Sequence, residues 1–245
     1  MSRKIFIKWF TGSIIILFSA LALATLLVFR KEDSRDFKPD SVKEVDTCTR
    51  KEPYHLEPEF ERAISFIEQR FSPIYAGNFL TEMKNCLNIQ YGELHKDGAE
   101  GMFYFDNTVS SPNNLVISVD RSYLQKDDYM TAILLVHEIT HARQFYTQTT
   151  KSCVDIEVEA FWNEFLLTTK FNEGEKKALL ARMYNPNDYP SSDQNIRQLE
   201  ETMDLLIEAD KNCSGNTKCK QDKAIDLLRT KISSSPFYQK QCQLN

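Results

Sequence analysis

The feature that most constrains the fold is an apolar segment carrying three ionisable side chains. In DDYMTAILLVHEITHARQFYTQ, residues 127–148, the side chains of His137, Glu138 and His141 directly follow the apolar run AILLV. This pattern predicts a long, largely buried helix. Burying two imidazoles and a carboxylate together is unfavourable unless something compensates them. The fold must therefore supply a compensating partner, and a metal ion is the simplest one.

The spacing of the two histidines suits a metal ion. His137 and His141 stand four residues apart, so a helix places them one turn apart on the same face. From there both imidazoles reach one zinc ion at about 2.0–2.1 Å. Glu138 lies beside them, where its carboxylate can take a proton from a metal-bound water without ligating the metal. We therefore predict His137 and His141 as metal ligands and Glu138 as the catalytic base.

The third ligand is predicted to be a carboxylate. The metzincin pattern H-E-x-x-H-x-x-G-x-x-H has glycine and histidine at the positions of Gln144 and Thr147. This difference excludes the metzincin class of zinc peptidases. The apolar face of residues 154–171 predicts a second helix, and Glu157 and Glu159 lie near its start. The spacing alone leaves both glutamates open as ligands.

HEITHARQ followed by EVEA resembles the gluzincin zinc metallopeptidases, whose second motif has the form E-x-x-A or E-x-x-S. The resemblance covers roughly residues 115–161. It implies Zn²⁺ as the cofactor, a peptide or protein as the substrate, and Glu157 as the third ligand, with Glu159 as the fallback. Ala160 would be the small residue that packs behind the ligand. Phe161 occupies the position where many of these families carry an aspartate.

The same resemblance implies a zincin-like domain, with a small sheet before the active-site helix. In that sheet an edge strand pairs with extended substrate, and residues 115–119 are the candidate. The sequence itself indicates two neighbouring strands, the expected arms of a hairpin, in MFYFD (102–106) and LVISVD (115–120).

Helical spacing predicts most of the remaining chain to be α-helical. The expected segments are 57–71, 79–89, 171–184 and a helical hairpin formed by 196–210 and 223–232. The predicted fold class is therefore α+β, mostly α, with a helical C-terminal part.

The N-terminus predicts a membrane anchor. Residues 9–29 carry no charge, and about 21 apolar residues span the ~30 Å hydrocarbon core. Arg3, Lys4 and Lys8 precede the run, which favours a cytoplasmic N-terminus. We expect residues 1–30 to form a cytoplasmic stub and transmembrane helix, residues 31–56 a charged linker, and residues 57–245 an extracytoplasmic domain. A cleaved signal peptide is the alternative, because Ala22-Leu23-Ala24 resembles a cleavage site.

The cysteines and the net charge narrow the environment and the partners. All six cysteines follow the apolar run, which favours disulfides in a periplasmic or extracellular compartment. Cys213 and Cys219 flank SGNTK, so we predict a local bridge between them. The net charge of −5 and the lack of a long basic run argue against a nucleic-acid partner.

These patterns together predict a membrane-anchored, extracytoplasmic zinc metallopeptidase. The alternative is an exported, disulfide-bonded binding domain with a structural or degenerate metal site. Tyr184 and Tyr189 are candidates for stabilising the oxyanion. His55 and His95, the other two histidines, lie in polar segments and are expected at the surface.

Overall fold

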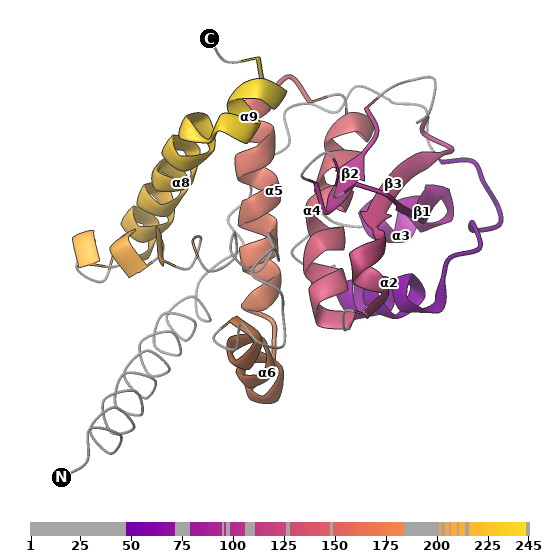
Figure 1. Ribbon diagram of the computed structural model, residues 1–245, viewed down its shortest axis with the longest axis horizontal. Coiled ribbons are helices and arrows are strands. Elements are labelled where there is room, and N and C mark those ends of the chain that lie inside the picture. Colours follow the sequence, from indigo (N-terminus) through magenta and orange to yellow (C-terminus); the bar gives the residue numbers. More distant parts are fainter. Residues whose placement is uncertain are drawn as a thin grey trace.

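The structure, a computed structural model, describes residues 48–243 except 72–78, 95, 97–98, 106–110, 126–127, 148, 184–200, 202–203, 206, 210 and 214–215 (Figure 1). The predicted anchor and most of the predicted linker lie outside the described residues, as do His95, Tyr184 and Tyr189. Among the helices that are described, none has the length and hydrophobicity needed to cross a membrane.

The predicted fold class is confirmed at the level of α+β, because the chain is mostly helical with one small sheet. Figure 1 shows α4 and α5 side by side, with α2 and the sheet on one side of this pair and α8 on the other. The helices are α2 (Pro58–Arg70), α3 (Phe79–Met83), α4 (Asp128–Tyr146), α5 (Cys153–Thr168), α6 (Glu173–Met183), α8 (Thr217–Ser234) and α9 (Pro236–Gln241).

The helix that carries the two histidines lies in the centre of the molecule. Every residue of α4 from Met130 to Ala142 is buried, as expected for a helix that is apolar on all sides. In contrast, α2 is amphipathic and buries Phe60, Ile64 and Ile67 on a single face. Because α4 packs against α2, α5 and the sheet, most of its surface meets protein rather than bulk water.

The sheet has three strands in the order β1-β3-β2. The two predicted strands are confirmed as neighbours: β2 (Gly101–Phe103) runs antiparallel to β3 (Leu115–Asp120). The expectation of an edge strand at 115–119 is wrong, because β3 is the central strand and all its residues are buried. An uninterrupted apolar run is typical of a strand that is covered on both faces. The edge strand that packs against α4 is β2.

The predicted helix over 79–89 is wrong beyond Met83. A short 3₁₀-helix, Lys84–Cys86, follows α3, and then β1 (Leu87–Gly92) begins and pairs in parallel with β3. Leu87 and Ile89 are buried, whereas Asn88 and Gln90 are more exposed. Buried residues thus recur every 3.6 positions before this point and every second position after it. The strand is short, so its pattern was read as a continuation of the preceding helix.

Three disulfides join distant and local parts of the fold. They link Cys48 to Cys86, Cys153 to Cys242 and Cys213 to Cys219. The last of these confirms the predicted local bridge. Cys48 and Tyr54 also pack against the main core. Of the predicted helical hairpin, the second arm is confirmed as part of α8, whereas most of the first arm lies outside the described residues.

Candidate metal centre

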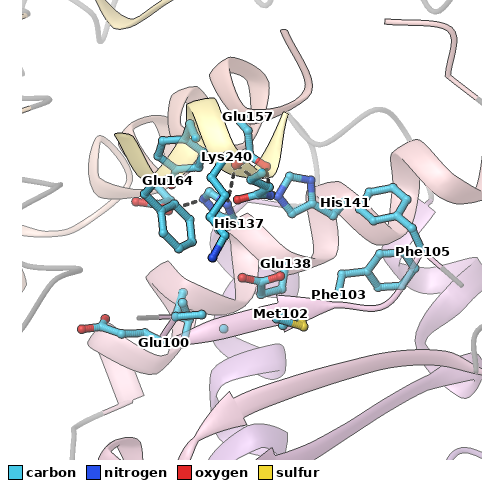
Figure 2. Close-up of a pocket in the computed structure, with 16 residues that line it drawn as sticks. Glu100, Met102, Phe103, Phe105, His137, Glu138, His141, Glu157, Glu164 and Lys240 are labelled. Carbon is cyan, nitrogen blue, oxygen red and sulfur yellow. Dashed lines mark hydrogen bonds and ion pairs between the residues drawn. The ribbon is translucent and has the colours of Figure 1, made fainter. Parts of the chain in front are cut away.

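Two neighbouring helices bring three metal-ligating side chains together. His137 and His141 project from α4, and Glu157 projects from α5 (Figure 2). Glu157 Oε2 lies 3.5 Å from His137 Nε2 and 3.6 Å from His141 Nε2. The ligand atoms of the three residues all lie within 4.8 Å of one another. All three residues are buried, with exposed fractions of 8%, 5% and 3%, so this group could hold a metal ion.

His137 is oriented by a second glutamate of α5. Its Nδ1 lies 2.6 Å from Glu164 Oε1, and a carboxylate there accepts a hydrogen bond from Nδ1–H. This leaves the lone pair on Nε2, which faces Glu157. Glu164 stands seven residues after Glu157, or two helical turns, and therefore lies on the same face of α5. Phe161, which lies between the two glutamates in the sequence, packs edge-on against the His137 ring.

His141 is oriented by Gln144 of its own helix. Gln144 Nε2 donates hydrogen bonds to Ile156 O at 3.1 Å and to Glu159 Oε2 at 2.7 Å. Its Oε1 is therefore the atom that lies 2.9 Å from His141 Nδ1 and accepts a hydrogen bond from it. The Nε2 lone pair of His141 consequently faces Glu157. In their neutral form both imidazoles are thus held in the tautomer that binds a metal ion through Nε2.

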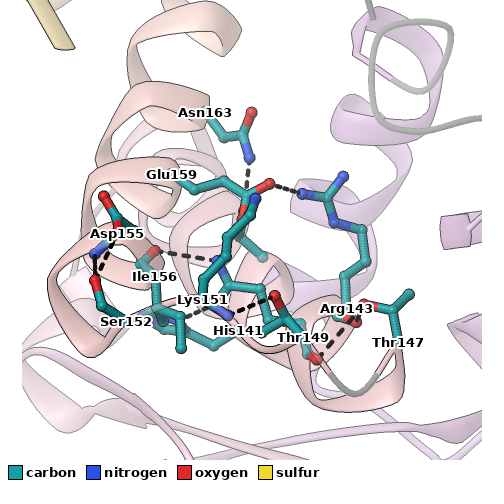
Figure 3. A network of polar contacts seen from close by, with 12 residues as sticks. His141, Arg143, Thr147, Thr149, Lys151, Ser152, Asp155, Ile156, Glu159 and Asn163 are labelled. Carbon is teal, nitrogen blue, oxygen red and sulfur yellow. Dashed lines mark hydrogen bonds and ion pairs between the residues drawn. The ribbon is translucent and has the colours of Figure 1, made fainter. Parts of the chain in front are cut away.

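The fallback ligand, Glu159, lies in a different environment (Figure 3). Its carboxylate accepts hydrogen bonds from Arg143 Nη2 at 2.5 Å and from Lys151 Nζ at 3.1 Å, besides the bond from Gln144. Burial acts to raise the pKa of Glu159, but Arg143, Gln144 and Lys151 outweigh it and lower the pKa. The charge of Glu159 is therefore neutralised away from the two histidines.

The electrostatics of the three-residue group favour a positive charge between its members. Burial acts to lower the pKa of His137, but hydrogen bonds to Glu157 and Glu164 outweigh it and raise the pKa well above its ordinary value. Burial likewise acts to raise the pKa of Glu157, but His141 and His137 hold that pKa well below its usual range. Either protons or a metal cation can supply the charge that this arrangement stabilises.

Glu138 lies beside the group, between α4 and β2. Glu138 is only 4% exposed. Burial raises the pKa of its carboxyl group, although His137 and His141 act in the opposite direction. The backbone amide of Phe103 donates a hydrogen bond to the carboxylate. A Cβ atom on Gly101 would lie 2.5 Å from Glu138 Oε1. Strand β2 therefore holds this carboxylate from the backbone side, and only glycine at 101 leaves room for it.

The group opens into a cavity of about 500 Å³. One wall comes from β2 and the residues that flank it, the base from α4 and α5, and the other wall from α9. Phe105 and Phe237 line the cavity from opposite walls and are 47% and 38% exposed. Large exposed aromatic side chains beside polar groups are typical of ligand-binding sites.

The outer edge of β2 faces this cavity. Asp120 N–H donates to Glu100 O, and Tyr104 N–H donates to Val116 O. Gly101 and Phe103 alternate along β2 with the residues that hydrogen-bond to β3. In an antiparallel pair such alternate residues direct their backbone groups away from the partner strand. Both line the cavity, so an extended chain bound there has backbone groups of β2 within reach.

Comparison with models of protein families, with curated proteins and with solved structures found no match.

The structure brings together His137, Glu138, His141 and Glu157, as predicted from the sequence. His55 is exposed, as expected. Sequence reasoning missed three residues that hydrogen-bond to members of this group: Glu164 to His137, Gln144 to His141 and Gln241 to Glu157. A buried glutamate two helical turns beyond Glu157 could have been noticed from the pattern, whereas Gln241 had no sequence signal.

Proposed function

We propose that the chain is a zinc-dependent metallopeptidase whose ligands are His137, His141 and Glu157 and whose catalytic base is Glu138. The observation that carries the proposal is the arrangement of these four buried side chains at the base of an open cavity. Structural zinc sites are closed by four protein ligands, whereas catalytic sites have three and keep one position for water. In the described part of the chain the group has three members, which supports the catalytic alternative.

The geometry of the group fits zinc. Ligands that each lie about 2.0–2.1 Å from a tetrahedral ion are separated from one another by roughly 3.3–3.5 Å. Glu157 Oε2 lies 3.5 and 3.6 Å from the two imidazole Nε2 atoms. Two neutral imidazoles and one carboxylate are also a usual donor set for catalytic zinc. These two separations and the donor types therefore both support zinc, while the ligand atoms as a set lie within 4.8 Å of one another.

The residues around the ligands supply the other requirements of peptide hydrolysis. A bound zinc ion would polarise the peptide carbonyl and lower the pKa of a water molecule. Glu138 would accept the proton of that water and transfer it to the nitrogen of the leaving amine. Phe103 N–H and the close backbone of Gly101 hold the carboxylate in place.

A peptide is the substrate class that the cavity supports best. The backbone groups of β2 that face the cavity can pair with an extended peptide, and such pairing requires little of its side chains. Phe105 and Phe237 offer apolar surface to one of those side chains.

The proposal places the enzyme outside the cytoplasm, attached to a membrane by residues 1–30. All six cysteines form disulfides, which suits an oxidising compartment. The uncharged run at 9–29 supports the anchor. Expressing the full chain and labelling its domain with an impermeant reagent in intact cells would test this orientation.

The first prediction concerns Glu138. The variant Glu138→Gln keeps the size of the side chain but cannot accept a proton, so we expect hydrolysis of a casein or peptide-library substrate to fall by at least about 100-fold. Zinc content should stay near one ion per chain, because Glu138 is not a ligand. His137→Ala should lose both zinc and activity. The measurements are metal content by mass spectrometry and peptide cleavage by chromatography.

Two results would contradict the proposal. Cleavage by the purified Glu138→Gln variant at the wild-type rate would show that another residue is the base. A wild-type domain that binds much less than one zinc per chain, with no change in His137→Ala, would favour an exported binding domain instead.

A further inference from the structure

The last helix of the described chain lies over the metal-binding group. Helix α9 spans Pro236–Gln241, and Phe237, Tyr238, Lys240 and Gln241 all line the cavity. Figure 2 shows Lys240 in front of His137 and Glu157, on the side of the cavity opposite β2. A segment at the far end of the chain therefore completes the wall of a site whose ligands come from α4 and α5.

One side chain of α9 contacts a ligand directly. Gln241 Nε2 donates a hydrogen bond of 2.9 Å to Glu157 Oε1. The other carboxylate oxygen, Oε2, is the atom that faces both imidazoles. A carboxylate that is held through one oxygen cannot rotate freely, so the bond directs Oε2 towards the histidines. Each ligand thus has one orienting partner: Glu164 for His137, Gln144 for His141 and Gln241 for Glu157.

A covalent bond holds α9 in this position. Cys242, the residue after Gln241, is bridged to Cys153, which precedes Glu157 by four residues, or about one helical turn. Tyr238 adds an apolar contact by packing edge-on against Phe161. Because α9 has only six residues, its own backbone hydrogen bonds stabilise it weakly. The disulfide is therefore a covalent constraint on where Gln241 lies, directly beside it in the chain.

We propose that Gln241 is the positioning residue for Glu157 and that the Cys153–Cys242 disulfide sets its position. This inference rests on the proposed zinc site. It means that the site reaches its full metal affinity only after the C-terminal helix has been bridged to α5. Metal loading is then coupled to disulfide formation, so the chain acquires its hydrolytic site after it has entered an oxidising compartment.

The first arm of the test measures the zinc affinity of variants in α9 by competition with a chromophoric chelator. Gln241→Met keeps the length of the side chain but cannot donate to Glu157. We expect its zinc affinity to fall about tenfold, at the lower end of the 10–100-fold range for residues that orient a ligand, because Gln241 is exposed on its other side. Gln239→Met is the matched control, since Gln239 lies in the same helix and bonds to Ser233 O.

The second arm removes disulfides. The double variant Cys153→Ser/Cys242→Ser should lose as much zinc affinity as Gln241→Met or more, whereas Cys213→Ser/Cys219→Ser should bind zinc as the wild type does. Adding Gln241→Met to the first double variant should cause little further loss, because the bridge acts through Gln241. The melting temperature of the metal-free protein should not differ between Gln241→Met and Gln239→Met.

The outcomes separate this inference from the proposed function. If the wild type binds no zinc, the proposed function and the inference are both wrong. If the wild type binds zinc and Gln241→Met binds it equally tightly, only the inference is wrong. Full additivity of the losses from Gln241→Met and from the bridge variant would also contradict it. If the bridge variant fails to fold, the comparison of Gln241→Met with Gln239→Met still decides the role of Gln241.

Discussion

Glu157 and Glu159 are two residues apart, but they have different surroundings because of the helical repeat. Residues at i and i+2 of a helix point about 200° apart and do not face the same neighbour. Glu157 therefore faces the two histidines, whereas Glu159 faces Arg143 and Lys151. One glutamate is part of the metal-binding group, and the other joins α4 to the start of α5.

This difference gives a prediction at the scale of single residues. A residue that only orients a ligand contributes about 10–100-fold to metal affinity. Glu157→Gln removes a ligand and should therefore weaken zinc binding by more than this. Glu159→Gln should leave zinc affinity within a few-fold of wild type. It should instead lower the free energy of unfolding by about 1–3 kcal/mol, because it removes the charge partner of two cations. Chelator competition and urea denaturation measure the two effects. The reverse pattern would make Glu159 the ligand.

At the scale of elements, the contact between β2 and α4 determines where the carboxylate of Glu138, the proposed base, lies. Strand β2 is short and lies at the edge of the sheet, and its residue 101 passes so close to α4 that a Cβ atom would meet the Glu138 side chain. The neighbouring Phe103 amide donates to the same carboxylate. This edge strand therefore has two tasks under the proposed function: it holds the Glu138 carboxylate, and it offers backbone groups to a substrate.

Gly101→Ala tests the first of these tasks. The new methyl group would lie 2.5–2.9 Å from three atoms of Glu138, which forces the flexible carboxylate to move while the fold is kept. A displacement of about 1 Å can cost on the order of 100-fold in rate, so we expect peptide cleavage to fall by about that factor with zinc still bound.

Gly92→Ala is the control for this variant, because its Cβ would meet Ser118 at an ordinary 3.4 Å. It should cleave peptide at nearly the wild-type rate. If Gly101→Ala were as active as Gly92→Ala, the close approach of β2 to Glu138 would have no catalytic importance.

At the scale of the whole molecule, the site lies where two hydrophobic clusters meet. The main core contains α2, most of α4 and the sheet. A second cluster joins Val154, Val158 and Phe161 of α5 to residues of α8 and α9. The three candidate metal ligands come from the helices on either side of this boundary, α4 and α5. Disulfides reinforce both halves, with Cys48–Cys86 in the first and Cys153–Cys242 in the second.

The two long-range bridges should therefore have separable effects. Removing Cys48–Cys86 with the double variant Cys48→Ser/Cys86→Ser opens a loop of 38 residues and should lower the free energy of unfolding by about 2–4 kcal/mol. Zinc affinity should not change, because neither cysteine lines the cavity. Urea denaturation and zinc titration of the folded variant measure both quantities. A weaker zinc site in that folded variant would contradict the division into two halves.

The local parts of the site could be predicted from the sequence by itself. His137 and His141 share a helical face because of the 3.6-residue repeat, and this requires no knowledge of the rest of the fold. Three other features depend only on segments of a few to about twenty residues. They are the burial of α4, the strands β2 and β3, and the short Cys213–Cys219 bridge. Propensity and periodicity act over those distances.

Only the tertiary structure decided what depends on contacts between segments far apart in the chain. The parallel pairing of β1 made β3 central and left β2 at the edge, which no local pattern could reveal. The packing of α5 on α4 brought Glu157 and Glu164 to the histidines, and a disulfide over 89 residues brought Gln241 to Glu157. These contacts form because buried apolar surface and covalent bonds stabilise one global arrangement, and that stabilisation has no signature in the spacing of neighbouring residues.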